Sequence, residues 1–149
     1  MRMVIQRVQK ACVTAGGELA GEIGKGFLVL IGICGTDDEK VCDKMLKKLI
    51  GLRIFEDEKG KTNLSLKDVG GELLLVSQFT LYADCRRGNR PGFSNAAGAE
   101  QANALYEYLL AGARQLTDTV RQGVFGAHME ISLVNDGPFT IILDSEDLT

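Results

Sequence analysis

The hydrophobic and polar positions in the first part of the chain predict three strands. Residues 2–15 are rich in strand-forming residues, and the pair Gly16-Gly17 is typical of a two-residue hairpin turn. Residues 18–23 are then expected to form the return strand. The unbroken apolar run at 27–31 is typical of a central strand that is buried on both faces.

Two amphipathic stretches predict helices. Thr36 and Glu39 match a capping box, in which two side chains satisfy free backbone N–H groups at the start of a helix. The apolar stripe that follows consists of Val41, Cys42, Met45, Leu46 and Leu49. A second helix is predicted over roughly 97–115, where one side carries Ala102, Leu105, Tyr106, Leu109, Ala113 and Leu116.

The remaining pattern completes a mixed fold. Residues 72–81 predict a strand that begins apolar and ends polar, and a loop rich in arginine and glycine follows at 82–95. The segment 128–144 alternates well enough for two strands, which break at 135–138. Because two helices can cover a sheet on one side only, we expect one α/β domain over residues 1–149, with a mixed sheet in a three-layer β/β/α arrangement.

Composition narrows the classes of function. A formal charge of −3 argues against a general nucleic-acid coating protein, but it permits a local contact with one end of an RNA. The single histidine cannot build a three-histidine zinc site within one chain, and we expect no metal or cofactor. The four cysteines lack metal or redox spacing and are expected to be free thiols. No signal peptide or membrane span is predicted, so we expect a cytoplasmic protein.

The first candidate site follows the apolar strand, at Ser77, Gln78, Phe79 and Thr80. Strand alternation would put Gln78 and Thr80 on one face, and Ser77 and Phe79 on the other. These side chains either bond to nearby backbone or form part of a site. A nucleophilic Thr80 would need a base, and His128 is the one histidine. Catalysis would therefore depend on positioning and on backbone N–H donors aimed at an oxyanion.

The second candidate segment is NDGPFT at 135–140. Its Gly137-Pro138 pair is either an ordinary reverse turn or a site where a cis bond is accessible.

Together these segments resemble a known family. SQFTL at 77–81 and NDGPFT at 135–140 are similar to the paired signatures of the D-aminoacyl-tRNA deacylases, also called D-Tyr-tRNA deacylases. The resemblance spans essentially the whole chain and includes RVQKACV at 7–13, RRGNRPGFSNAA at 86–97 and GVFGAHM at 123–129. Phe139 departs from it, because the family more often carries valine there, and we expect this change to alter packing under the turn but not the reaction.

The resemblance implies a proofreading hydrolase that acts in translation quality control. Such enzymes hydrolyse the ester between a D-amino acid and the 3′-terminal adenosine of tRNA, and they accept glycine, including glycine mischarged on alanine tRNA. The family is homodimeric, with its site at the interface. Gly137-Pro138 would be the Gly–cis-Pro pair that one subunit inserts into the pocket of the other. There it would exclude an L side chain sterically, while a D side chain points outward.

The same resemblance assigns roles to individual residues. The N–H groups of Phe79 and Thr80 would stabilise the oxyanion, while the substrate 2′-hydroxyl helps to activate a water. Ser77 and Gln78 would shape the pocket and hold the adenosine. The remaining assignments are that Arg7 holds the Gly-Pro carbonyl geometry and that Phe125 and Met129 line the adenosine pocket.

Two other classes of protein remain open. The first is a non-catalytic RNA- or DNA-associated module on the same fold, although such a module has no need of the Gly-Pro pair. Its surface would consist of Lys40, Lys44, Lys47, Lys48, Arg86, Arg87 and Arg90, and the alternative for these lysines is a solvated helix face. The second class is a metal-dependent hydrolase, which the single histidine and the lack of a ligand cluster disfavour.

Overall fold

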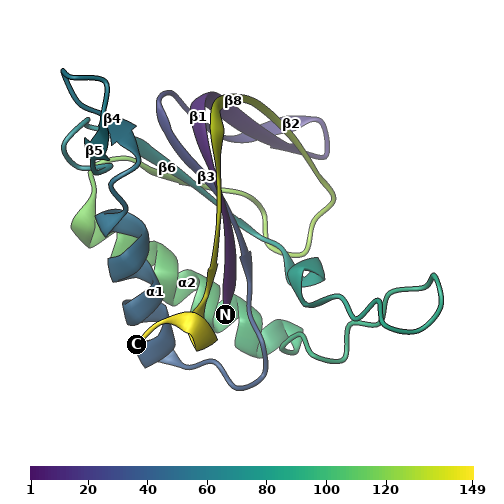
Figure 1. The fold of residues 1–149 in the computed structure, drawn as a ribbon. Helices are drawn as coiled ribbons and strands as arrows, with labels where there is room; N and C mark the ends of the chain where they lie inside the picture. Colours follow the sequence, from purple (N-terminus) through teal and green to yellow (C-terminus); the bar gives the residue numbers. More distant parts are fainter.

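The computed structural model describes all residues from 1 to 149 (Figure 1). Its strands are β1 (Arg2–Ala15), β2 (Glu18–Ile23), β3 (Gly26–Gly32), β4 (Phe55–Glu56), β5 (Thr62–Leu64), β6 (Glu72–Ser77), β7 (Val120–Gln122) and β8 (Met129–Asp144). Its helices are α1 (Glu39–Gly51) and α2 (Ala99–Leu116), with the short 3₁₀ helices η1 (Phe79–Tyr82) and η2 (Ser145–Asp147). The β4–β5 hairpin and β7 were not predicted from the sequence.

The main sheet has the order β2-β1-β3-β6-β7, and β8 pairs with β1 as well. The predicted hairpin between β1 and β2 is confirmed, with Gly16 and Gly17 both at positive φ (60° and 79°). The φ of these residues explains why two glycines stand at this turn. β3 and β6 run parallel in the centre of the sheet, and β4 and β5 form a separate small hairpin.

Residues of the central strand alternate between two hydrophobic clusters. Phe27, Val29 and Ile31 belong to the larger cluster, which includes the buried faces of α1 and α2. Leu28 faces the other way, into the smaller cluster with Val8, Ala11, Val13, Ile23, Leu74 and Val76. The prediction of a strand buried on both faces is therefore confirmed.

The second layer is formed by the β1–β2 hairpin, which passes over the face of the sheet that the helices leave free. A Cβ at Gly21 of β2 would lie 2.9 Å from the Gln122 carbonyl oxygen of β7, so only glycine permits this close crossing. With α1 and α2 on the opposite face (Figure 1), the layers are hairpin, sheet and helices. The predicted β/β/α arrangement is confirmed. None of the helices is both long and apolar enough to span a bilayer.

The start of α1 differs from the predicted capping box. Asp38, not Thr36, is the N-cap, and its carboxylate accepts the Val41 N–H at 2.9 Å. Asp37 is buried and accepts from the Cys34 N–H and from the Met1 amino group, while the Thr36 hydroxyl lies 3.2 Å from the Cys34 sulfur. Asp38 therefore takes the capping role that the sequence pattern predicted for Thr36, and Asp37 instead holds the Met1 amino group.

The prediction of two strands within 128–144 is wrong, because β8 is one continuous strand. Its pairing with β1 is nevertheless irregular. Between the pairs Gln6–Thr140 and Val8–Asn135, β8 advances five residues while β1 advances two. The extra residues around Gly137-Pro138 are accommodated as a bulge in a long strand instead of a turn between two strands.

Candidate active site

β6 ends at Ser77, and the chain then leaves the sheet. Ser77 pairs with Ile31 of β3, and the Gln78 N–H donates to the Ile31 carbonyl at 2.7 Å. Because β3 stops at Gly32, no neighbouring strand supports a longer β6, and the backbone turns into η1. The predicted strand over 72–81 is therefore four residues too long, and the alternation expected for 77–80 does not apply.

This turn leaves two backbone donors without partners. The Leu81 N–H donates to the Gln78 carbonyl at 3.2 Å, which is the first bond of η1. The N–H groups of Phe79 and Thr80 precede that bond and donate to no oxygen in the chain. They are two adjacent donors of the kind that bind an oxyanion.

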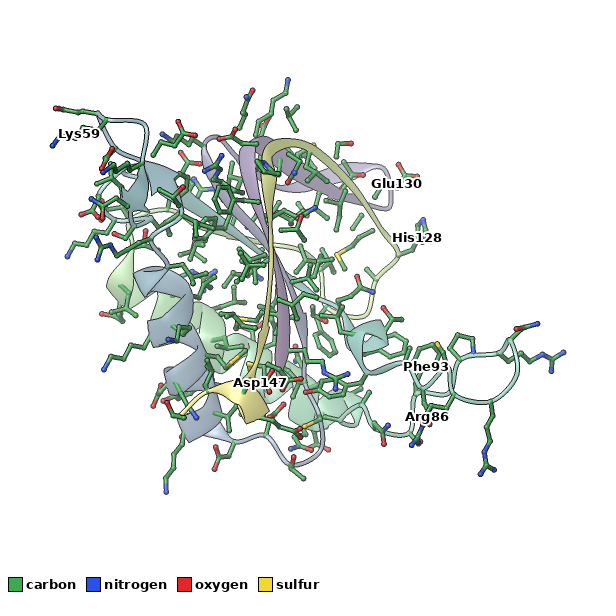
Figure 2. The ribbon with its side chains drawn as sticks, viewed as in Figure 1. Lys59, Arg86, Phe93, His128, Glu130 and Asp147 are labelled. Atoms are coloured by element: carbon green, nitrogen blue, oxygen red, sulfur yellow. The ribbon has the colours of Figure 1, made fainter.

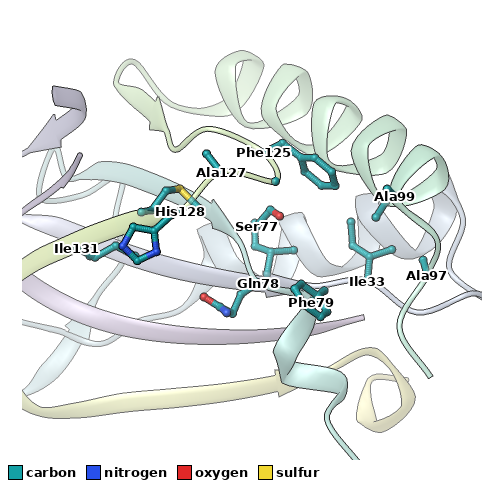
Figure 3. Close-up of a pocket in the computed structure, with 14 residues that line it drawn as sticks. Ile33, Ser77, Gln78, Phe79, Ala97, Ala99, Phe125, Ala127, His128 and Ile131 are labelled. Carbon is teal, nitrogen blue, oxygen red and sulfur yellow. The ribbon is translucent and has the colours of Figure 1, made fainter. Parts of the chain in front are cut away.

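A pocket of about 530 Å³ opens beside η1 (Figure 3). Ten of its fourteen lining residues are hydrophobic, as is usual for a site that binds an organic ligand. Five of the predicted site residues line it, namely Ser77, Gln78, Phe79, Phe125 and Met129. Sequence reasoning named His128 only as a possible base for Thr80, and it missed the others: Ile31, Ile33, Ala97, Ala99, Ala102, Gly126, Ala127 and Ile131.

The far wall of this pocket is held by tight packing. The Phe125 ring lies 6.0 Å from Tyr106, whose hydroxyl donates to the Leu75 carbonyl at 2.8 Å. Burial raises the pKa of Tyr106 to about 12, so its hydroxyl keeps the proton that it donates. The Met129 sulfur accepts the Val124 N–H at 3.3 Å. In Figure 3, Ser77 is seen between the rings of Phe125 and Phe79.

Thr80 has no activating base within the chain. Its side chain is exposed and does not line the pocket, and its hydroxyl contacts the Gln78 amide. His128 does line the pocket, but no hydrogen bond joins it to Thr80. No cluster of three or more histidine, cysteine, aspartate or glutamate side chains is arranged to hold a metal ion.

Arg7 fixes the backbone just before Gly137. Its side chain is buried and donates to two carbonyl oxygens, that of Ile54 at 2.6 Å and that of Asp136 at 3.0 Å. The Asp136 carboxylate lies 3.3 Å from the same guanidinium. The guanidinium also lies 4.3 Å from the centre of the Phe139 ring. Phe139 therefore packs on Arg7 beneath the bulge.

Gly137-Pro138 does not belong to the pocket of its own chain. The peptide bond between them is cis, and both residues are exposed. Arg7 holds the Asp136 carbonyl just before Gly137, so Arg7 marks the position of this segment along the sheet. Met3 pairs with Ile31, and Ile31 pairs with Ser77, so Met3 marks the position of Ser77. Along β1, Arg7 and Met3 are four residues apart. At about 3.3 Å per residue, this offset is about 13 Å along the sheet. One chain thus presents the two segments at separate places.

Comparisons with known proteins agree with this architecture. A family model described as D-Tyr-tRNA(Tyr) deacylase matches residues 4–144. The "D-aminoacyl-tRNA deacylase" of Clostridioides difficile is 56% identical over 145 residues, covering 97% of each chain. That of Symbiobacterium thermophilum is 53% identical over 146 residues, covering 98% of this chain and 97% of its own.

Two solved structures are also similar. The "c-Myc DNA Unwinding Element Binding Protein" superposes with a TM-score of 0.92 at 43% identity, covering 97% of this chain and 98% of its own. A "probable eukaryotic D-amino acid tRNA deacylase" shares the fold, with a TM-score of 0.84 at 17% identity over 95% of this chain and 97% of its own.

The fold, the pocket and these relatives define a hydrolase of the aminoacyl-tRNA ester bond. More closely, the chain belongs to the D-Tyr-tRNA(Tyr) deacylase family, as the resemblance of its two motifs predicted.

Proposed function

We propose that the pocket beside η1 binds the 3′-terminal adenosine of a D-aminoacyl-tRNA and that residues 1–149 act as one catalytic domain. The observation that carries this proposal is the pair of unpartnered N–H groups at Phe79 and Thr80, next to an apolar pocket without a nucleophile–base pair. The chain's membership of a deacylase family indicates that the substrate is an aminoacyl-tRNA ester. The pocket supplies room for a nucleoside.

The reaction is a hydrolysis in which the substrate itself provides one of the catalytic groups. The 2′-hydroxyl of the terminal ribose helps to activate a water, which adds to the ester carbonyl. The resulting oxyanion binds the N–H groups of Phe79 and Thr80, and the 3′-oxygen then leaves with a proton. One such donor contributes about 3–4 kcal/mol to transition-state binding.

The adenosine is held by the two ends of the pocket. Phe125 and Met129 offer an aromatic ring and a polarisable sulfur for the flat face of a base. Ser77 and Gln78 offer a hydroxyl and an amide for its polar edges and for the ribose.

A second copy of the chain supplies the chirality gate. Gly137-Pro138 is exposed, does not line the pocket of its own chain and lies about 13 Å along the sheet from the level of Ser77, which favours a role in the pocket of another copy. β8 also has one edge without a partner strand, and its exposed apolar side chains include Ile142, which is 71% exposed. These features favour a symmetric homodimer with its sites at the interface.

Discrimination then works by exclusion. The backbone at Gly137-Pro138 is a wall that an L side chain would overlap, while a D side chain points away from it. Arg7 is a positioning residue, because it holds the carbonyl of Asp136 that precedes this wall. Glycine has no side chain to exclude, so glycyl-tRNA, including glycine mischarged on alanine tRNA, is also a substrate. The four free cysteines and the tRNA substrate favour a cytoplasmic location.

The decisive assay compares purified protein on D- and L-tyrosyl-tRNA. We expect rapid release of D-tyrosine, release of glycine from glycyl-tRNA, and no acceleration with the L-ester. Hydrolysis of neither tyrosyl ester would contradict the proposal. Binding of tRNA without turnover would favour the non-catalytic nucleic-acid module. One structural neighbour is named as a DNA-binding protein of this kind, the "c-Myc DNA Unwinding Element Binding Protein".

A further inference from the structure

The loop between η1 and α2 carries a concentrated positive charge. Three arginines and one aspartate give residues 84–94 a formal charge of +2, in a chain whose formal charge is −3. In Figures 1 and 2 this loop extends away from the body of the molecule, and Arg86 and Phe93 mark its base. Its side chains surround a hollow of about 570 Å³ lined by Asp84, Arg86, Arg87, Arg90, Gly92 and Ser94, none of which is hydrophobic.

The base of this loop is ordered by its own contacts. Asp84 and Gly92 exchange two backbone hydrogen bonds, of 2.7 and 2.9 Å, so the loop closes as a hairpin. Gly88 near its tip is at φ 66°, a conformation that favours glycine. The charged side chains are therefore displayed on a formed hairpin.

Only one of the three arginines is paired within the chain. Arg86 donates to both carboxylate oxygens of Asp84, at 2.8 and 2.6 Å, and its hydrogen bonds lower the pKa of Asp84 to about 2. Arg87 and Arg90 are exposed and have no acidic partner. Two guanidinium groups thus remain available to an external anion.

The loop is physically continuous with the pocket. It begins directly after η1 and returns to Ala97, which lines the pocket and donates its N–H to the Ile33 carbonyl at 2.9 Å. At the base of the loop, Phe93 packs edge-to-face on the pocket residue Phe79, with 5.1 Å between ring centres. The base of the loop is therefore joined to the rim of the pocket through the backbone and through the contact between Phe79 and Phe93.

We infer that the 84–94 loop binds the phosphodiester backbone of the tRNA acceptor end, with Arg87 and Arg90 as its phosphate contacts. Arginine suits this role because its planar guanidinium donates two parallel bonds to a phosphate. Such contacts position an RNA without reading its sequence. The inference rests on the proposed function, which places the terminal adenosine in the adjacent pocket.

The test is the salt dependence of binding to deacylated tRNA by the Arg87→Ala/Arg90→Ala double variant. Each phosphate contact contributes roughly 0.7–0.9 to the slope of log K against log salt. We expect the variant's slope to fall in magnitude by roughly 1.4–1.8, so that its affinity deficit shrinks about tenfold from about 50 to about 200 mM salt. The Arg87→Lys/Arg90→Lys variant should recover most of the slope, because it keeps both charges.

Matched controls remove two positive charges elsewhere. Lys59 and Lys61 are exposed in the β4–β5 turn, and Figure 2 shows Lys59 at the opposite side of the molecule from Arg86. We expect Lys59→Ala/Lys61→Ala to leave the slope unchanged. The same holds for Lys47→Ala/Lys48→Ala on the exposed face of α1. Equal slopes for the arginine variant and the wild type, or a loss confined to the α1 variant, would overturn the inference.

Kinetics separate this inference from the proposed function. With D-tyrosyl-tRNA, the arginine variant should raise KM and leave kcat near the wild-type value. With 3′-O-D-tyrosyl-adenosine, which has no phosphates, the KM difference should vanish. A wild-type protein that hydrolyses neither ester would refute the proposed function, while the slopes with deacylated tRNA would still decide the role of the loop.

Discussion

Two segments of this protein, 77–80 and 136–139, leave their β-ladders for different reasons and with different surroundings. The first leaves because its neighbour β3 ends, and it turns beside a pocket of about 530 Å³. The second bulges from a strand that continues, and it faces solvent. A Cβ at Gly137 would approach only one group of its own chain, the Asn135 amide at 3.3 Å. The first segment lines a pocket, and the second is an exposed stretch of backbone that lines no pocket of its own chain.

The difference extends to how each segment is fixed. The backbone at 77–80 is fixed by the end of a parallel sheet, and its free N–H groups follow from the geometry of a 3₁₀ turn. The backbone before Gly137 is fixed instead by the Arg7 guanidinium. In the proposed dimer, the first segment performs the chemistry and the second selects the substrate. Substitutions in the first segment should therefore lower the rate of hydrolysis, whereas substitutions in the second should lower the discrimination between D- and L-esters.

The largest effect is expected from Phe79→Pro. Proline is tolerated at the first position of a helical turn, but it has no N–H. We expect the single-turnover rate on D-tyrosyl-tRNA to fall by about 10²–10³, the usual loss for one oxyanion donor. Phe79→Ala is the matched control, since it loses the same contact with Phe93 but keeps the N–H. Equal rates for the two variants would remove this N–H from the mechanism.

A smaller and different effect is expected from Gly137→Ala. The added methyl meets little of its own chain, so we expect the melting temperature to stay unchanged. In the pocket of a second copy it would disturb the wall, and we expect the ratio of D- to L-tyrosyl-tRNA hydrolysis to fall about tenfold. Unchanged rates on both esters would refute the exclusion of L side chains by this segment.

The smallest effect is expected from Thr80→Ala, because the backbone N–H survives. The lost hydroxyl contacts only the Gln78 amide and is exposed. We expect the single-turnover rate to stay within about threefold of wild type, in line with the loss of one neutral hydrogen bond. A fall of several orders of magnitude with tRNA binding intact would instead identify Thr80 as a nucleophile.

Much of the fold was predictable because local signals and packing agree. The apolar run at 27–31 and the Gly16-Gly17 turn each permit few structures, and both appear where expected. The capping box failed because Asp38 caps α1, while the neighbouring Asp37 is held by buried contacts with Met1 and Cys34. Such a choice depends on residues distant in sequence.

The site was predictable only in part for a similar reason. The motif at 77–80 can be found from its sequence. Ile33 and Ala99 have side chains without functional groups, and only the fold brings them to the same pocket. The register of a parallel pair could have suggested Ile31, because it lies opposite Ser77. The continuity of β8 could not be foreseen, since a Gly-Pro pair usually ends a strand.

The central claim is that a pocket and a gate from different copies make one active site, and subunit mixing tests it most directly. Phe79→Pro inactivates the pocket of one chain, and Gly137→Phe blocks whichever pocket receives the gate. If the gate acts across the dimer, each mixed dimer recovers one site that joins an intact pocket to an intact gate. Random mixing of the two inactive proteins should then restore about a quarter of wild-type activity on D-tyrosyl-tRNA. A mixture that forms mixed dimers and stays inactive would contradict the account.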